Sequence, residues 1–230
     1  MISLVYLDRK NHIVIDGLTF DNPEAWGRNG VIIVKRCKDV KILNCRAGDK
    51  QAISWRSGPF VRARSCNDLR IEGNVCWGTD YPLELVGCNR AILKNNTIVD
   101  ATMRGCNLHG CDELTVVNNI WFRPCIPLKA NAAICLSGTS KTNVVCDYNL
   151  FYSPYPAHKV GSITGSVSGN NLAQWQEQTK YDKHSIQADP LFMDYEKGNF
   201  HLKPGSPAIG KGKDGETIGA LGVGKMDQSK

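Results

Sequence analysis

Residues 83–98 read Leu83-Glu84-Leu85-Val86-Gly87-Cys88-Asn89-Arg90-Ala91-Ile92-Leu93-Lys94-Asn95-Asn96-Thr97-Ile98. Apolar Leu83 and Leu85 alternate with Glu84, which is the period of a strand that buries one face. A turn, a second strand and an Asn followed by an apolar triplet complete the unit. Strands this short cannot bury a core alone, so we expect the unit to stack on copies of itself.

The same unit recurs from about Val31 to Tyr152, with an earlier copy before it. The successive corner residues are Gly17, Asn44, Asn74, Asn96, Asn119 and Asn149, at intervals of 27, 30, 22, 23 and 30 residues. The links between strands are too short for crossover helices, and parallel strands without helices wind into a coil. The repeat therefore predicts a parallel β-helix of about six rungs.

The corner residues have a physical reason of their own. A sharp turn between strands needs a residue in the left-handed region, which Gly and Asn adopt at least cost. Stacked coils also bring the side-chain amides about 4.8 Å apart, so each can bond the next. We therefore expect the corner residues to be left-handed and the Asn side chains to form a ladder.

These repeats resemble the right-handed parallel β-helix proteins of the pectate-lyase-like superfamily. The segments Asp189–Phe192, Phe200–Ile209 and Ile218–Ala220 are similar to the ending of many secreted bacterial β-helix proteins that act on polysaccharides. The resemblance implies an all-β, single-stranded parallel β-helix in an extracellular or periplasmic location. We expect residues 1–152 to form the coils, and residues 153–230 to form a cap of loops with a short helix at 171–177.

The net charge and the distribution of aromatic residues limit the kinds of partner that the protein can bind. The net charge of +6 and a pI near 8.8 favour an acidic partner, which could be a uronate-containing polysaccharide, nucleic acid or an anionic surface. No interleaved aromatic residues support nucleic acid, and no apolar stretch is long enough to span a bilayer. Residues 1–6 lack the features of a signal peptide, and the chain starts inside the repeat. We therefore expect preceding coils, or another chain, to cover the open first coil.

Ten cysteines would often indicate a disulfide framework, but their spacing follows the repeat. Cys66, Cys88 and Cys111 each lie eight residues before the corner Asn, and Cys37 lies seven before. We expect them to stack as small buried thiols, with one disulfide between neighbouring rungs as the alternative. Zinc is not expected, because no C-x-x-C pair is present.

In the superfamily that the chain resembles, ligands lie along one parallel sheet beside the long loops, and we take this sheet to hold the first strand of each copy. Alternation then points Arg62, Glu84 and Asn107 outward on consecutive rungs, with Arg64 and His109 at the strand ends. The adjacent loops add further candidates. These are the substrate-binding candidates Lys50, Trp55, Arg56 and Tyr81, the catalytic candidate Arg104 and the metal-ligand candidate Asp80.

β-Elimination at a uronate needs a cation that neutralises the carboxylate and a base that removes the adjacent C5 proton. Arg62 or Arg64 could neutralise, and His109 or Arg104 could act as base. The oxygens of Glu84, Asn107 and Asp80 could instead hold Ca²⁺. This set is partly similar to the calcium-dependent chondroitinase B and alginate lyase group, but Glu84 has no second Glu beside it and the matching strand has no Lys.

Three alternatives stay open beside a polysaccharide lyase. A glycoside hydrolase needs two carboxyl groups about 5–9.5 Å apart, which Glu84 with Asp80 or Asp100 could supply. A non-catalytic β-helix module for carbohydrate binding or structural support would need neither reaction. The polar column could also be a salt-bridged surface without a function.

Overall fold

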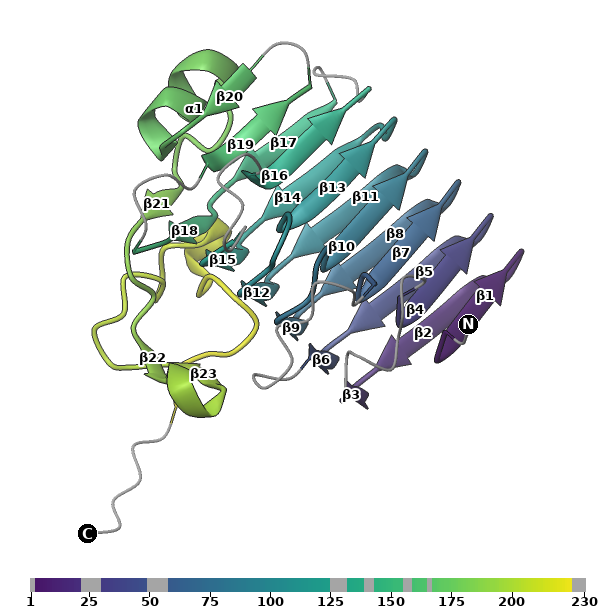
Figure 1. The fold of residues 1–230 in the computed structure, drawn as a ribbon, viewed down its shortest axis with the longest axis horizontal. Coiled ribbons are helices and arrows are strands. Elements are labelled where there is room, and N and C mark those ends of the chain that lie inside the picture. Colours follow the sequence, from purple (N-terminus) through teal and green to yellow (C-terminus); the bar gives the residue numbers. More distant parts are fainter. Residues whose placement is uncertain are drawn as a thin grey trace, which may run out of the picture.

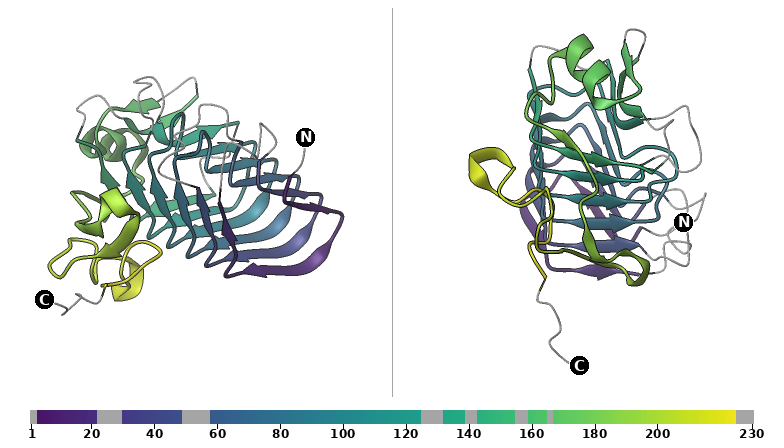
Figure 2. Two further views of the ribbon diagram at one scale, coloured as in Figure 1. Left: turned by 60° about the horizontal axis from the view of Figure 1, so that its bottom comes forward. Right: turned by 90° about the vertical axis from the view of Figure 1, so that its left-hand side faces the viewer.

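The computed structural model describes residues 3–21, 30–48, 58–124, 132–138, 143–154, 159–164 and 167–224. Within these residues, six successive coils each contribute one strand to each of three parallel sheets (Figure 1). The sheets form the walls of a tube, which Figure 2 shows from two further sides. The predicted all-β parallel β-helix is confirmed.

The three sheets take their strands in the order of the coils. Sheet A contains β1 (Val5–Asp8), β4 (Ile32–Lys35), β7 (Val61–Arg64), β10 (Leu83–Val86), β13 (Cys106–His109), β16 (Ala132–Ser137), β19 (Lys159–Ile163) and the antiparallel β20 (Val167–Gly169). Sheet B contains β2 (Asn11–Asp16), β5 (Lys38–Leu43), β8 (Asn67–Glu72), β11 (Asn89–Lys94), β14 (Leu114–Val117) and β17 (Val144–Asp147). Sheet C contains β3 (Thr19–Phe20), β6 (Arg46–Gly48), β9 (Val75–Trp77), β12 (Thr97–Val99), β15 (Ile120–Phe122), β18 (Leu150–Tyr152) and β21 (Ile186–Gln187).

The interior of the tube follows directly from the alternation in the sequence. Leu83 and Leu85 are completely buried, whereas Glu84 between them is only half-buried. Their register partners Cys106 and Leu108 on β13 are buried in the same way. Each large apolar side chain taken out of water contributes about 1.5–3 kcal/mol, so the stacked columns supply the driving force for coiling.

The asparagine ladder is confirmed for four coils. Asn74, Asn96, Asn119 and Asn149 are buried, and the side-chain Nδ2 of each of the first three donates to the Oδ1 of the next. These bonds measure 3.0, 3.0 and 3.1 Å in chain order. The ladder thus satisfies amides that would be costly to bury alone.

The register differs from the expected one at the second coil. Arg46 pairs with Val75, so Cys45 and not Asn44 lies in line with Asn74. The backbone N–H of Cys45 donates to the Asn74 Oδ1 at 2.9 Å. Asn44 is not part of the ladder, and its side chain bonds Asp16 near the surface.

The prediction that every corner Asn is left-handed is wrong for the four ladder residues. The positive φ belongs to the residue before each of them, at Gly73, Asn95, Asn118 and Tyr148. Gly17 and Asn44, in the first two coils, do have positive φ as expected. The turn therefore divides its two tasks between two residues: one reverses the chain, and the next carries the ladder amide inward.

The predicted thiol column is also present. The backbone N–H groups of Asn67, Asn89 and Asp112 donate to the carbonyl oxygens of Cys37, Cys66 and Cys88, at 3.0, 2.9 and 3.0 Å. These bonds place the three cysteines and Cys111 on consecutive rungs. All the cysteines that the structure describes are buried, and none of them forms a disulfide bond.

The sheets continue past Tyr152, where the last full coil was expected to end, because β19 extends sheet A and β21 extends sheet C. The helix α1 (Leu172–Thr179) follows, with Asn171 as its N-cap. The indole of Trp175 in α1 is fully buried against Gly161 and Gly169. A Cβ at either glycine would lie 2.6 Å from Trp175, so the helix can close the end of the tube only over residues without side chains.

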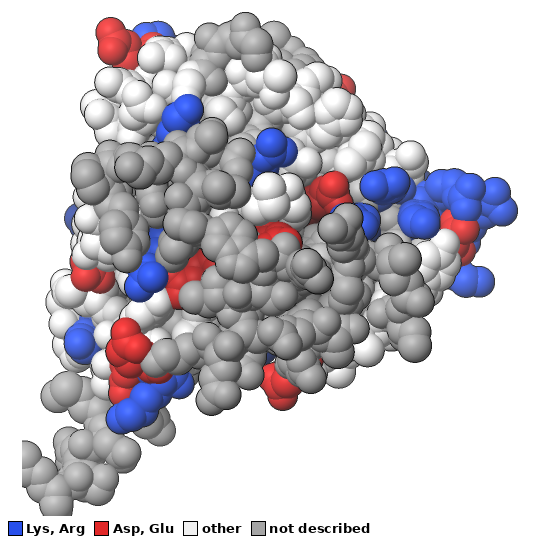
Figure 3. All heavy atoms as spheres, in the orientation of Figure 1, with Lys and Arg blue, Asp and Glu red and all other residues white. Residues whose placement is uncertain are grey.

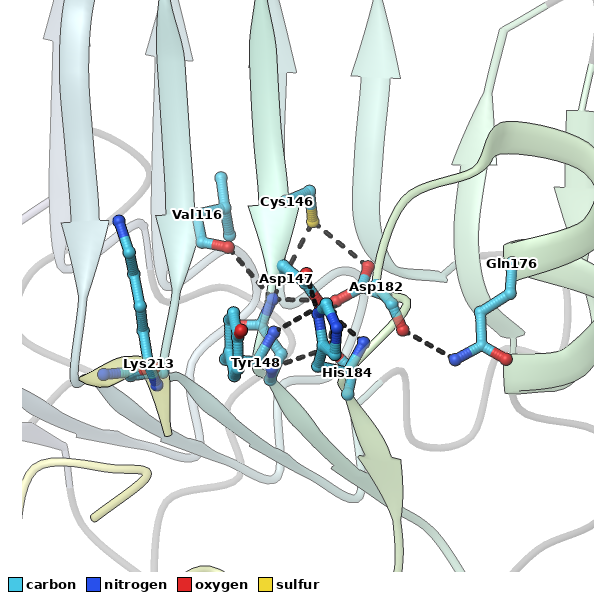
Figure 4. Close-up of polar contacts among 11 residues, drawn as sticks. Val116, Cys146, Asp147, Tyr148, Gln176, Asp182, His184 and Lys213 are labelled. Carbon is cyan, nitrogen blue, oxygen red and sulfur yellow. Dashed lines mark hydrogen bonds and ion pairs between the residues drawn. The ribbon is translucent and has the colours of Figure 1, made fainter. Parts of the chain in front are cut away.

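The ladder ends on a buried carboxylate, which Figure 4 shows in close-up. Asp182 accepts hydrogen bonds from Asn149 Nδ2 at 2.9 Å, Trp175 Nε1 at 2.8 Å and Ser185 Oγ at 2.6 Å. The Cys146 thiol donates to the same carboxylate at 3.1 Å. One side chain therefore ties the last ladder amide to the capping helix.

Residues 188–224 cover the outer face of sheet C. The antiparallel pair β22 (Phe192–Asp194) and β23 (Asn199–Leu202) is joined by a 3-10 helix (Tyr195–Lys197), and a second 3-10 helix spans Lys213–Gly215. The Phe200 ring contacts Trp77 edge-on at 4.9 Å between centroids. Among the described residues, no helix is long and apolar enough to cross a membrane.

Replacing Asn96 by Ala should destabilise the protein by about 3 kcal/mol or more. The change leaves the buried Asn74 N–H, the Ile71 carbonyl and the Asn119 Oδ1 without this partner. Asn44→Gly is the matched control and should stay within about 0.5 kcal/mol, because glycine accepts the left-handed backbone of Asn44. Urea unfolding measures both, and equal losses would contradict the register.

Candidate functional site

The outer face of sheet A carries two columns of side chains set by strand register. In the first column, Glu84 pairs with Arg62 on one side and with Asn107 on the other. In the second, Val86 lies between Arg64 and His109. The predicted placement of these residues on consecutive strands is confirmed, with about 4.8 Å between neighbouring strands.

An ion pair joins two strands of the first column. Arg62 donates from Nε to the Glu84 carboxylate, and the two side chains are 20% and 18% exposed. At this depth the pair is less screened by solvent than an ordinary surface pair. It gives the middle of the face a fixed arrangement of charge.

Two loops add groups beside this column. Arg104, which precedes β13, donates from Nη1 to Asn107 Oδ1 at 3.1 Å, and its guanidinium lies 6.0 Å from the centre of the Tyr81 ring. The Nε of Arg104 is buried and has no hydrogen-bond partner within the described part of the chain. Burial raises the pKa of Tyr81, with smaller effects from the charges of Arg104, Asp80 and Glu84.

Asp80 links these two loops and does not face the column freely. It is only 7% exposed, and its carboxylate accepts a hydrogen bond from Thr102. Its backbone carbonyl accepts from the N–H groups of Met103 and Arg104. Burial raises the pKa of Asp80, against the opposing effect of the Thr102 hydrogen bond.

Asp100, the other carboxylate considered for hydrolysis, belongs to a different contact. It is almost fully buried, and its Oδ2 accepts from Trp77 Nε1 at 3.2 Å and from the Tyr195 hydroxyl. Both partners belong to the packing between sheet C and the C-terminal residues. The structure therefore does not bring Asp100 to Glu84.

The oxygens proposed for Ca²⁺ do not fit a cation. Glu84 faces the Arg62 guanidinium, Asn107 Oδ1 accepts from Arg104, and Asp80 accepts from Thr102. Two positive groups thus occupy the positions where a hard divalent ion would need negative or neutral oxygens. Across the described residues, no cluster of three or more His, Cys, Asp or Glu side chains is arranged to hold a metal.

The second column is more exposed. His109 lies with Nδ1 at 2.8 Å from Ser137 Oγ, and Arg64 forms no ion pair with any residue that the structure describes. The candidates Lys50, Trp55 and Arg56 lie outside the described residues. Of the predicted set, the structure brings together Arg62, Glu84, Asn107, Arg104 and Tyr81.

Thr102 and Ser137 were not found from the sequence, although the repeat contains a signal for the first. Thr102 lies 22 residues after Asp80, which is the interval between Asn74 and Asn96 on the same two coils. Two residues separated by the repeat interval lie side by side on neighbouring coils, so this interval is the signal that identifies Thr102 as the neighbour of Asp80.

Comparison with protein families agrees with this geometry. The family model described as the right-handed β-helix region matches residues 3–149, which is more than half of the chain. The chain belongs to the right-handed β-helix family. No curated protein matches the sequence of this β-helix. The right-handed β-helix supports a carbohydrate-active or a structural protein, and does not by itself choose a reaction.

Asp80 should give the β-helix a characteristic pH dependence. Its folded-state pKa is raised above the ordinary value of 3.8, so its contribution to stability is full below that value and is lost as pH rises through the folded pKa. Asp80→Asn still accepts from Thr102 and cannot ionise. The melting temperature of this variant relative to the native protein should therefore increase between about pH 4 and about pH 7.

Asp68→Asn is the control with the opposite sign. A hydrogen bond from Arg90 lowers the pKa of Asp68, so its stabilisation is present above the ordinary pKa and is lost on acidification. The relative melting temperature of this variant should therefore fall as the pH rises to about 4, and should change little between about pH 4 and about pH 7. Parallel behaviour of the two variants would contradict the assignment of Asp80.

Proposed function

We propose that this β-helix is a polysaccharide lyase that binds a uronate-containing chain along the outer face of sheet A and cleaves it by β-elimination. The observation that carries the proposal is the grouping of Arg104, Asn107 and Tyr81 beside the Arg62–Glu84 pair. The net charge of +6 supports an acidic substrate. We also propose an extracellular or periplasmic location, where such polymers occur.

Arg104 and Asn107 are the groups suited to hold the uronate carboxylate. Both side chains are partly exposed, and Asn107 presents its amide N–H₂ beside the guanidinium. A cation and hydrogen-bond donors directed at the carboxylate stabilise the negative charge that develops when C5 loses its proton. The Arg62–Glu84 pair fixes the neighbouring strand and supplies polar contacts to sugar hydroxyls.

His109 and Tyr81 flank the first column, one at the end of β13 and the other before the start of β10, and they supply the base and the acid of the elimination. His109 is exposed, and with Nδ1–H bonded to Ser137 Oγ its Nε2 can take the C5 proton. The electron pair of that C–H bond forms the C4–C5 double bond, and the C4–O bond breaks. Tyr81, whose pKa is raised by burial, keeps its proton and can give it to the leaving oxygen.

The alternatives have weaker support. Hydrolysis needs a second carboxyl group facing Glu84. Asp80 is buried and accepts a hydrogen bond from Thr102, and Asp100 accepts one from Tyr195, so neither carboxylate faces Glu84. A purely structural β-helix would not need the guanidinium of Arg104 and the amide of Asn107 grouped beside the Arg62–Glu84 pair. These observations favour a lyase over a glycoside hydrolase or a non-catalytic module.

The test is turnover of alginate, pectin and chondroitin, followed by the ultraviolet absorbance of unsaturated uronates. Arg104→Ala, His109→Ala and Tyr81→Phe should each lower kcat/KM by about 100-fold or more. Arg90→Ala removes a basic residue from sheet B and should leave turnover unchanged. New reducing ends without absorbance would show hydrolysis, and binding of all three polymers without turnover would show a non-catalytic module.

A further inference from the structure

A cavity lies away from sheet A, between the ends of the sheet C strands β15 and β18 and the C-terminal residues. Its volume is about 320 Å³. Its lining includes Phe122, Arg123, Tyr152, Asp189, Tyr195 and Lys203. None of the polar residues of the two sheet A columns lines it. The cavity is therefore separate from the proposed catalytic face.

Aromatic rings form one wall of this cavity. The Phe122 ring lies between Tyr152 and Tyr195, with centroid distances of 5.4 and 5.0 Å. Tyr195 is anchored by its hydroxyl, which donates to the buried Asp100. The packed rings give an apolar surface of fixed shape, which loses little entropy when a ligand packs on it.

Polar groups of both signs surround the rings. Arg123 lies over the Tyr195 ring at 5.3 Å and pairs with Asp100 at 3.0 Å. Asp189 and Lys203 are exposed at the rim, and Glu196 also lines the cavity. Because Arg123 is paired with Asp100, the remaining Lys203, Asp189 and Glu196 offer hydrogen bonds in several directions and give no excess of positive charge to attract an anionic sugar.

The volume of the cavity and the chemistry of its lining together indicate the kind of ligand. Binding pockets for small molecules measure about 300–1,000 Å³, so this cavity suits one sugar ring rather than an oligosaccharide. A pyranose presents C–H groups on one face, which pack on an aromatic ring, and hydroxyls at its edge, which carboxylates and ammonium groups bind. We infer that this cavity binds a single neutral pyranose unit.

The inference deepens the proposed function and rests on it only for the identity of the polymer. A sugar held at the cavity would keep the polysaccharide near the sheet A face and raise its effective concentration there. The binding itself depends on Tyr152 and its neighbours and on no catalytic step.

Binding of methyl glucoside, methyl galactoside, methyl mannoside and free galacturonate to the full chain, measured by saturation-transfer NMR and calorimetry, tests the site. We expect at least one neutral glycoside to bind in the millimolar range. Tyr152→Ala should weaken that binding about tenfold or more, whereas Tyr152→Phe keeps the ring and should stay within about threefold. If Tyr152→Ala does not fold, Lys203→Ala at the exposed rim should weaken binding several-fold.

Two controls separate this site from sheet A. Arg104→Ala should retain full glycoside binding, so loss of turnover and loss of this site are distinguishable. Tyr6→Ala, at an exposed tyrosine of the first coil, should also leave binding unchanged. The inference is overturned if no neutral glycoside binds, if Tyr152→Ala binds as well as the native chain, or if galacturonate binds tighter than all three glycosides.

Discussion

In-register stacking of one coil on the next is the constraint on which the rest of this protein depends. Strand spacing puts each inward side chain directly against its counterpart in the neighbouring coil, so a buried polar group is tolerated only where the counterpart can satisfy it. Asn96 meets this condition by bonding Asn119 and accepting from Asn74. Where the repeats stop, the ladder needs a different partner, and there the Asp182 carboxylate accepts a hydrogen bond from the amide of Asn149.

The same stacking positions the candidate site. Arg62, Glu84 and Asn107 are neighbours because three short strands share one register, although 45 residues of sequence separate the first from the last. Figure 3 shows Lys and Arg side chains gathered at the end of the molecule formed by the first coils, where Arg36 pairs with Asp8. A polyanion lying along sheet A would thus run from Asn107 toward a basic end, which agrees with the proposed acidic substrate.

The one error of register shows how much the repeat could reveal. Cys66, Cys88 and Cys111 lie eight residues before the ladder Asn, and Cys37 lies eight residues before Cys45 but seven before Asn44. Cysteine spacing alone therefore pointed to Cys45 as the ladder position. The residue type of Asn44 fits both tasks of the turn, and residue type cannot distinguish the left-handed position from the inward one.

The sequence by itself determined the period, the buried face of each strand and the outward direction of Arg62, Glu84 and Asn107, because these follow from local alternation repeated in every coil. Only the tertiary structure decided that Asp100 faces Tyr195 and that Trp175 closes the tube. These contacts join loops and C-terminal residues that have no counterpart in the next coil. Without a repeated partner, neither spacing nor alternation predicts which side chains meet.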